Sequence, residues 1–504
     1  MSHGRSLVIR NARVLALDDA GNEWPCADIV VEDGTIRAIG PEAAAGVRDP
    51  VKTIDGTGML AMPGLVNAHF HSPGNLAKGS LDNLPLELFM LYEVPPLATT
   101  ESGHRAGYVG TMLGAMEMLR RGITSVHDDA FHVPVASRDS VDAIMQAYAD
   151  SGMRATVAID QPNIVEYDKY PYLADLLPPE LRAEMDRAPR QTGEELLGLY
   201  GHLLERWHGS HGGRLRAAVS CSAPQRVTVD YFAGLSKLST EHDLPFNIHI
   251  LETKLQRVLG EVKFGKSLVR YVHELGFLDE RMMVIHAIWI DDADIALLAQ
   301  AGCTVAHNPV CNLRLGSGVM PFRKLRDANV PVCIGTDEAT VDDSINLWFA
   351  AKTAALVHTL SEPDYRHWPV ASEILHAVTR GGARAMRLEG RIGQLAPGCA
   401  ADIVLVDLDT AAFTPCNDLV RQLVLCEDGS GVRTTIVDGR VVYENGHITT
   451  VDERALRAEA REIAAAQRPL VAAAEAAARR LDPFYRDMYL RAARQDVGLT
   501  RRLS

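Results

Sequence analysis

Histidines and carboxylates stand where apolar runs of this 504-residue chain end. His69 and His71 close one such run and are followed by Ser72-Pro73-Gly74, which would stop a strand. Alternate residues of a strand project to the same face, so two imidazoles rooted about 7 Å apart could hold one small cation. A single His-x-His is also compatible with two hydrogen-bonded histidines at a strand end. The motif therefore needs further ligands before it indicates a metal.

Three later runs supply such groups. His249 ends one of them and Glu252 follows three residues later, where the chain would leave the strand for a loop. His286 lies in the next run, and Asp337 follows the last run. Four histidines, a glutamate and an aspartate on four separate runs would form a cage rich in nitrogen and oxygen donors. Such a cage suits Zn²⁺ or Fe²⁺.

Eight apolar runs alternate with helical stretches in the middle of the chain. The runs span residues 61–70, 123–131, 154–160, 215–222, 245–251, 282–290, 303–308 and 330–336. Continuous apolar strands that alternate with helices indicate a parallel sheet buried on both faces. Eight repeats match an α/β fold of the (β/α)₈ TIM-barrel type, in which functional side chains gather at the carboxyl ends of the strands. We expect the histidines and carboxylates to meet there.

Both ends of the chain differ from the middle in their pattern of apolar and polar residues. Short alternating runs separated by turns predict strands near residues 6–18, 27–40, 401–409 and 434–443. The sequence therefore predicts a small β-sandwich built from residues 1–60 and 389–450, a catalytic barrel over 61–388 and a helical tail over 451–504. We expect Pro469 to break or kink that tail.

Composition limits the class of protein. Lys and Arg total 51 against 65 Asp and Glu, a formal net charge of −14, which argues against nucleic acid or an anionic membrane as the partner. No apolar run approaches the roughly 20 residues of a membrane helix. The eight cysteines include no Cys-x-x-Cys pair and indicate reduced thiols in a cytoplasmic protein.

With these motifs the chain resembles the amidohydrolase superfamily. Within it, the resemblance is to the cytosine deaminase-like branch that contains the S-adenosylhomocysteine deaminases and the triazine hydrolases. The motifs that carry the resemblance lie at residues 63–71, 249–252, 285–287, 307–318, 335–337, 398–404 and 437–440. The resemblance implies a distorted barrel with a β-sandwich, and it leaves the substrate open.

The resemblance also implies roles for the residues. His69, His71, His249 and Asp337 would hold one divalent metal, with Zn²⁺ favoured and Fe²⁺ as the alternative. The metal would lower the pKa of a water molecule so that hydroxide is available at neutral pH. Glu252 would protonate a ring nitrogen and then the leaving group. His286 would orient the attacking water, and Asp337 would share its proton.

The expected reaction is the hydrolytic deamination of an aminated nitrogen heterocycle such as a purine, pterin, pyrimidine or triazine. Loss of chloride or an alkylamine from a triazine, or attack on a urea or amide carbon, would use the same site. A non-catalytic barrel with a structural metal is the competing class, although it would need neither Glu252 nor His286. Glu252 modestly favours loss of an amine, because a poor leaving group needs protonation.

Further expectations concern the number of metals, the substrate and the oligomeric state. Relatives with two metals carry a bridging Lys or Glu at the end of the third or fourth strand. Here those strands end in 160–162 and 219–224, without either residue, so one metal is favoured. Glu338 stands where many relatives have a small residue, and it would either bind a cationic or amino-rich substrate or point outward. We expect His132, Trp289 and Asn308 to contact the substrate, and the resemblance implies a homodimer or larger homo-oligomer.

Overall fold

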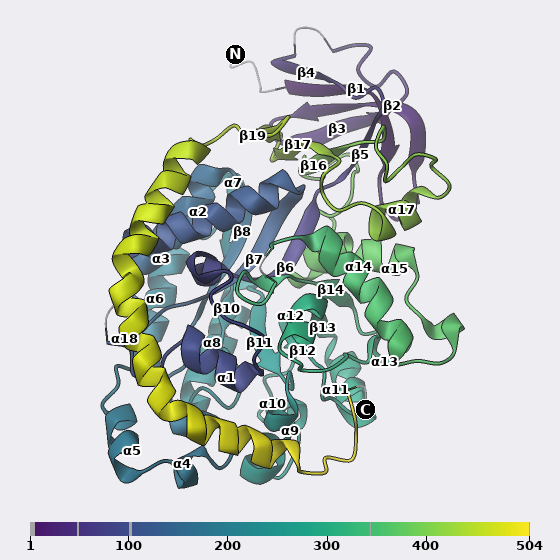
Figure 1. The fold of residues 1–504 in the computed structure, drawn as a ribbon. Helices are drawn as coiled ribbons and strands as arrows, with labels where there is room; N and C mark the ends of the chain where they lie inside the picture. Colours follow the sequence, from purple (N-terminus) through teal and green to yellow (C-terminus); the bar gives the residue numbers. More distant parts are fainter. Residues whose placement is uncertain (1–5, 48–49, 100–102, 343, 503–504) are drawn as a thin grey trace.

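The computed structural model describes residues 6–47, 50–99, 103–342 and 344–502. Figure 1 shows a body of strands surrounded by helices, with a separate, mainly antiparallel sheet at one end of it. The described helices are α1 (Leu86–Glu93), α2 (His104–Arg120), α3 (Arg138–Ser151), α4 (Leu173–Leu176), α5 (Pro179–Asp186), α6 (Gly193–Arg206), α7 (Ser210–Gly213), α8 (Val229–His242), α9 (Lys254–Leu259), α10 (Leu268–Glu274), α11 (Asp292–Ala301), α12 (Pro309–Arg314), α13 (Phe322–Asp327), α14 (Leu347–Val357), α15 (Ala371–His376), α16 (Gly382–Ala385), α17 (Leu419–Leu425) and α18 (Glu453–Ala493).

The central body contains two parallel sheets. Their strand orders are β15-β6-β7-β8-β9 and β10-β11-β12-β13-β14. The strands are β6 (Leu65–His71), β7 (Ile123–Phe131), β8 (Arg154–Asp160), β9 (Leu215–Ala217), β10 (Val219–Ser220), β11 (Phe246–Ile250), β12 (Met282–His286), β13 (Thr304–His307), β14 (Val332–Ile334) and β15 (Asp337–Glu338). Every one of the eight predicted runs contributes to these sheets.

The fourth and eighth runs join the two sheets. The fourth run is interrupted and gives one short strand to either sheet, β9 and β10. The eighth run forms β14 in one sheet, and β15 directly after the run belongs to the other. Across the second junction, the side chain of Asn67 donates to Thr336 Oγ1 at 2.8 Å and accepts from the Thr336 N–H at 3.0 Å. The sheets therefore follow one another in the order of a distorted (β/α)₈ barrel, as the sequence predicts.

The two chain ends share a nine-stranded sheet with the order β19-β18-β17-β16-β5-β1-β2-β3, in which β4 pairs with β1. The strands are β1 (Ser6–Leu15), β2 (Glu23–Glu32), β3 (Thr35–Gly40), β4 (Lys52–Asp55), β5 (Met59–Pro63), β16 (Ile403–Asp407), β17 (Val432–Val437), β18 (Arg440–Glu444) and β19 (His447–Ile448). The contact between the ends is direct, because β5 pairs with β16. The boundary that we propose near residue 60 thus falls inside β5, and the first predicted run divides at Gly64.

Local sequence explains where these elements begin and turn. Asp33 and Gly34 have φ values of 47° and 79° between β2 and β3, the left-handed conformations that a two-residue hairpin turn requires. The side chain of Thr192 accepts the Glu195 N–H and starts α6 with a reciprocal capping box. The same box starts α11 at Asp291. Turn and cap residues therefore place the elements before long-range packing is considered.

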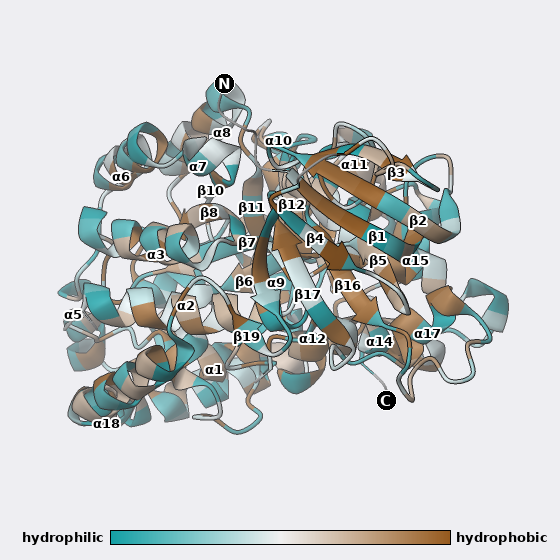
Figure 2. Cartoon of the chain, turned by 90° about the horizontal axis from the view of Figure 1, so that it is seen from above, coloured by the Kyte–Doolittle hydropathy of each residue, from teal (hydrophilic) through white to brown (hydrophobic). Residues whose placement is uncertain are grey.

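The tail forms one long helix. α18 continues through Pro469 and Pro483, so the expected break at Pro469 does not occur. Figure 1 shows α18 curving along one side of the barrel, where it contacts α1 and α2. In Figure 2 strands such as β1, β5 and β16 are mostly hydrophobic, whereas the surrounding helices carry both hydrophilic and hydrophobic residues. None of the described helices has the length and apolar character needed to span a membrane.

Candidate metal centre

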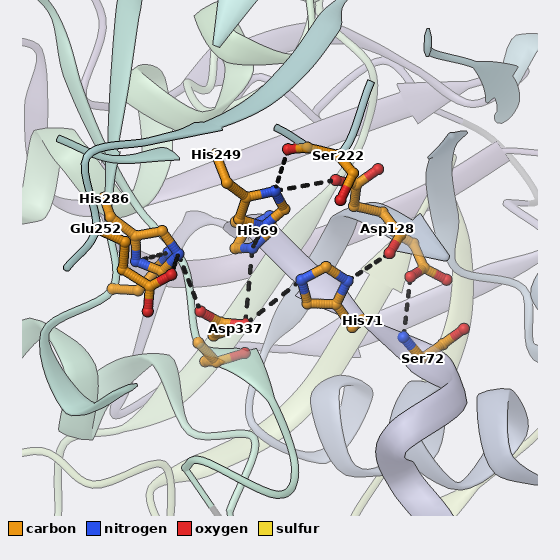
Figure 3. A network of polar contacts seen from close by, with 12 residues as sticks. His69, His71, Ser72, Asp128, Ser222, His249, Glu252, His286 and Asp337 are labelled. Atoms are coloured by element: carbon orange, nitrogen blue, oxygen red, sulfur yellow. Dashed lines mark hydrogen bonds and ion pairs between the residues drawn. The ribbon is translucent and has the colours of Figure 1, made fainter. Parts of the chain in front are cut away.

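β6 and β15 bring the first three candidate ligands together. The two strands pair in parallel, with Asp337 beside Phe70, so the Asp337 carboxylate faces the two histidines of β6. Asp337 Oδ1 lies 3.7 Å from His69 Nε2 and 3.6 Å from His71 Nε2. Asp337 has a φ of 65°, and this left-handed turn directs the carboxylate across the barrel mouth. Figure 3 shows the imidazoles converging on it.

His249 comes from β11 on the other sheet. Its Nε2 lies 3.3 Å from His69 Nε2, while its Nδ1 lies 2.7 Å from the Ser222 carbonyl oxygen. The Nδ1 of His71 likewise contacts the carbonyl oxygen of Asp129. A carbonyl only accepts, so both Nδ1 atoms carry the proton and both Nε2 atoms keep a free lone pair. The backbone therefore holds these two rings in the tautomer that a metal ligand needs.

This donor set fits a divalent cation. Two nitrogens bound to one zinc ion at about 2.1 Å in a tetrahedral arrangement lie about 3.4 Å apart. Three observed spacings are close to that value: His249 Nε2 to His69 Nε2 is 3.3 Å, and Asp337 Oδ1 is 3.6 Å from His71 Nε2 and 3.7 Å from His69 Nε2. Burial is the main cause that lowers the pKa values of His69 and His249 well below the usual value, and neighbouring imidazoles add to it. Both rings are therefore neutral and available as ligands at pH 7.

Glu252 and His286 lie on the open side of this cage. His286 Nε2 is 3.5 Å from Glu252 Oε2 and 3.7 Å from Asp337 Oδ2, and its Nδ1 is 3.0 Å from Asn312 Oδ1. Burial, followed by the charges of Asp337 and Glu87, raises the pKa of Glu252 well above its usual value. Glu252 can therefore hold a proton at neutral pH and donate it to a ligand.

A cavity opens in front of these residues. Its lining includes His71, His249, Glu252, His286 and Asp337, together with aromatic side chains of Phe89, Phe131 and Tyr170. Flat apolar walls beside a polar floor suit an aromatic ring whose polar edge faces the cage. The cavity thus joins a binding surface to the acid–base groups.

The three expected substrate residues have different positions. His132 lines the cavity, and burial lowers its pKa to about 4. Trp289 does not line it, because its indole N–H donates to the Ser317 carbonyl oxygen at 2.8 Å and the ring packs in the core. Asn308 is fully buried, and its amide nitrogen is 3.5 Å from His286 Nδ1. Asn308 therefore contacts a catalytic candidate and not the cavity.

Glu338 points inward. It is 5% exposed and lines the cavity with Glu93, and its Oε2 has no hydrogen-bond partner among the described residues. The two carboxyls approach Gly74, where a Cβ atom would lie 2.8 Å from Glu338 Oε2 and 3.2 Å from Glu93 Oε1. Of the two predicted orientations of Glu338, the outward one is therefore wrong. Burial and the Glu93 charge raise its pKa well above the usual value.

Sequence reasoning missed several lining residues. Glu93 is the last residue of α1, Arg226 lies in a loop, and Asp160 is the last residue of β8. An oxygen of Asp160 lies within 4.8 Å of ring nitrogens of His71 and His249, so these three side chains also form a group that could hold a cation. The Nδ1 atoms of His71 and His249 contact carbonyl oxygens, so only the Nε2 atoms of these rings are available as ligands. A carboxylate at the end of an apolar run was the signal that could have identified Asp160.

Comparison with known proteins agrees with this geometry. A family model described as the amidohydrolase family matches residues 60–442. The chain belongs to the amidohydrolase family. It is 33% identical over 464 residues to the 5-methylthioadenosine/S-adenosylhomocysteine deaminase of Nitratidesulfovibrio vulgaris, covering 92% of this chain and 98% of that protein. It is 30% identical over 458 residues to the 5'-deoxyadenosine deaminase of Methanosarcina mazei, covering 91% and 97%.

Solved structures give the same result for the fold of this amidohydrolase. An adenosine deaminase from Xanthomonas campestris with bound zinc superposes with a TM-score of 0.80 at 27% identity, covering 92% of this chain and 98% of that chain. Atrazine chlorohydrolase from Arthrobacter aurescens has a TM-score of 0.77 at 23% identity, covering 91% and 100%, which supports the fold alone. The family match and the deaminase relatives confirm the prediction of a hydrolytic aminohydrolase.

Proposed function

We propose that this amidohydrolase releases ammonia from an aminated nitrogen heterocycle with the help of one divalent metal per subunit. The observation that carries the proposal is the contact of Glu252 with His286 at 3.5 Å, on the open side of the cage of three histidines and Asp337. A purely structural metal site would need no acid or base beside it.

The chemistry of the proposed ligands supports zinc as the metal. His69, His71, His249 and Asp337 would hold it, with Zn²⁺ favoured over Fe²⁺ by the nitrogen-rich donors. When bound, such a metal supplies a Lewis acid that makes hydroxide available at neutral pH. The carbonyl contacts of His71 and His249 keep these rings oriented for that role.

The remaining residues move protons. His286 and Asp337 face each other at 3.7 Å and would orient the attacking water and take up its proton. Glu252 would protonate the ring nitrogen while the carbon–oxygen bond forms. The proton taken from water would pass from Asp337 and His286 to Glu252, which would then protonate the departing amine. The remaining hydroxyl proton would return to these groups as the oxo product forms. The carbon–nitrogen bond breaks, and the products are ammonia and the oxo form of the ring.

The substrate class follows from relatives and cavity together. The deaminases named above act on adenosine-type purines by their names, and the walls of Phe89, Phe131 and Tyr170 suit a flat ring. We propose a purine or a related amino-heterocycle as the substrate. A homo-oligomer in the cytoplasm belongs to the same proposal. The exposed apolar side chains of Phe349, Leu356 and Leu360, and eight cysteines without disulfides, support it.

The test measures ammonia release by zinc-loaded and iron-loaded protein. Aminopurines, pterins, pyrimidines and triazines serve as substrates, and chloride and alkylamine are followed in parallel. Ammonia from one ring class, lost after chelation, is the expected result. Release of chloride or an alkylamine alone would refute the deaminase and favour a triazine hydrolase. No product from any ring would refute the proposal and direct the search to ureas and amides.

A further inference from the structure

Arg226 is a buried cation at the cavity that the proposed mechanism does not use. It lies in the loop between β10 and α8, is 8% exposed, and lines the cavity together with Ser222, His249 and Glu252. A guanidinium has five N–H donors and keeps its charge at any ordinary pH. Its burial is costly unless acceptors surround it.

The structure provides few of those acceptors. The guanidinium makes one hydrogen bond, from Nη1 to Ser222 Oγ at 3.2 Å, and no carboxylate of the described chain lies within ion-pair distance. Two other buried arginines have more partners. Arg154 binds Asp402 through two nitrogens at 2.7 and 3.0 Å, and Arg214 donates to the carbonyls of Tyr148, Ala149 and Met153. Arg226 therefore keeps unused donors beside the cavity.

The position of Arg226 limits what can bind there. The Ser222 hydroxyl accepts the hydrogen bond from Arg226, and the Ser222 carbonyl oxygen contacts Nδ1 of the metal-ligand candidate His249 at 2.7 Å. One residue thus separates the guanidinium from the cage. Its positive charge also acts on Glu252 and lowers the pKa of that carboxyl against the larger effect of burial. A group bound by Arg226 would therefore lie in the same part of the cavity as His249 and Glu252.

We propose that Arg226 binds an oxygen acceptor on the heterocycle itself, so that the preferred substrate carries a ring oxo group in addition to the amino group that leaves. The inference rests on the proposed function, because it assumes that the ring sits over the cage. A planar fork of donors matches a carbonyl or enolate oxygen and an adjacent ring nitrogen. The substrate would then be an oxo-amino ring of the guanine or pterin type.

An anionic tail is the alternative occupant of a cationic site. The cations Lys169 and Arg190 also line the cavity, but both already have partners. Lys169 pairs with Glu166 at 2.6 Å, and Arg190 donates to the carbonyls of Met185 and Asp186. Lys169→Gln is therefore a matched control, since it removes a positive charge from the same cavity without removing a free donor.

The experiment compares substrates that differ by one oxygen. Zinc-loaded wild type, Arg226→Gln, Arg226→Lys and Lys169→Gln are assayed with guanine against 2-aminopurine and with 8-oxoadenine against adenine. Adenosine-5′-carboxylate against adenosine tests the tail. Loss of a charged hydrogen bond predicts that Arg226→Gln lowers kcat/KM for the ring-oxo member about 10- to 100-fold, with a change under about threefold for its partner. Arg226→Lys should recover part of the loss, and Lys169→Gln should leave both ratios unchanged.

Two results would overturn the inference: an equal loss for both members of each ring pair, or a loss confined to the 5′-carboxylate. If no probe yields ammonia, the proposed function fails separately. Calorimetric titration of guanine into the zinc-loaded proteins then decides the inference alone. Binding that is at least tenfold weaker in Arg226→Gln supports it, and equal binding in both proteins overturns it.

Discussion

Replacement of Glu252 by Gln isolates the proton donor from the metal cage. The amide has the same shape as the carboxyl, and the backbone N–H of residue 252 keeps its 2.9 Å hydrogen bond to Gln256 Oε1. The side chain contacts His286 at 3.5 Å and the Ser317 hydroxyl at 3.5 Å, and neither residue belongs to the proposed ligand set. We therefore expect Glu252→Gln to fold and to bind the metal as the wild type does.

The expected loss of activity is large. General acid–base catalysis contributes about 10²- to 10⁴-fold, which corresponds to roughly 3–5 kcal/mol of activation free energy. Both protonation steps, at the ring nitrogen and at the departing amine, depend on Glu252, so kcat should fall at least about 10³-fold. The assay is ammonia release per bound metal, with the metal content measured on the same sample.

Glu87→Gln is the matched control. Glu87 is a second buried glutamate near the site, and its Oε1 accepts the Thr253 hydroxyl at 2.5 Å. Burial raises the pKa of this carboxyl, so an amide changes little there, and kcat should stay within about tenfold. Retention of more than a tenth of wild-type kcat by Glu252→Gln at full metal content would refute Glu252 as the donor. Loss of the metal would instead make Glu252 a ligand.

Three further outcomes follow from the structure. Arg154→Ala leaves the 2%-exposed Asp402 side chain without its cation and should lower the free energy of unfolding, measured in urea, by about 3–5 kcal/mol. Arg13→Ala removes an exposed pair with Glu23 and should lower it by under about 1 kcal/mol. Burial lowers the pKa of His358 to about 4, so the stability that the neutral ring provides is complete above pH 6.5 and is lost as the pH falls towards 4. His358→Gln should reduce this loss of unfolding free energy by up to about 1.4 kcal/mol per pH unit, as measured by urea titrations at several pH values. Chelation should abolish ammonia release and lower Tm, and added Zn²⁺ should restore both, as calorimetry would show.

Much of the barrel and of the cage could be predicted because the relevant geometry is local. The spacing of His69 and His71 puts both rings on one face of a strand, and no distant contact is needed for that result. The strand-ending positions of His249 and Asp337 follow from the apolar runs before them, and parallel strands bring their carboxyl ends to one edge. Glycine-containing turns likewise predict the hairpins of the sheet that the two chain ends form.

Tertiary structure decided which side chains face the cavity. Trp289 looked available for stacking, but its indole N–H is bound to Ser317 and the ring belongs to the core. Arg226 was absent from the prediction, because a loop residue acquires its surroundings only when distant loops fold over the barrel mouth. The inward turn of Glu338 likewise depends on packing near Gly74.

By itself, the sequence determined the order of the strands, the donor types and the family. Periodicity, turn residues and ligand chemistry are properties of short segments, and these segments keep them in any fold that buries their apolar face. Only the tertiary structure decided the ring tautomers, which depend on the carbonyl oxygens of Asp129 and Ser222, and the free donors of Arg226. Hydrogen bonds between residues far apart in the chain have no periodic signal, so they are set by how the loops pack.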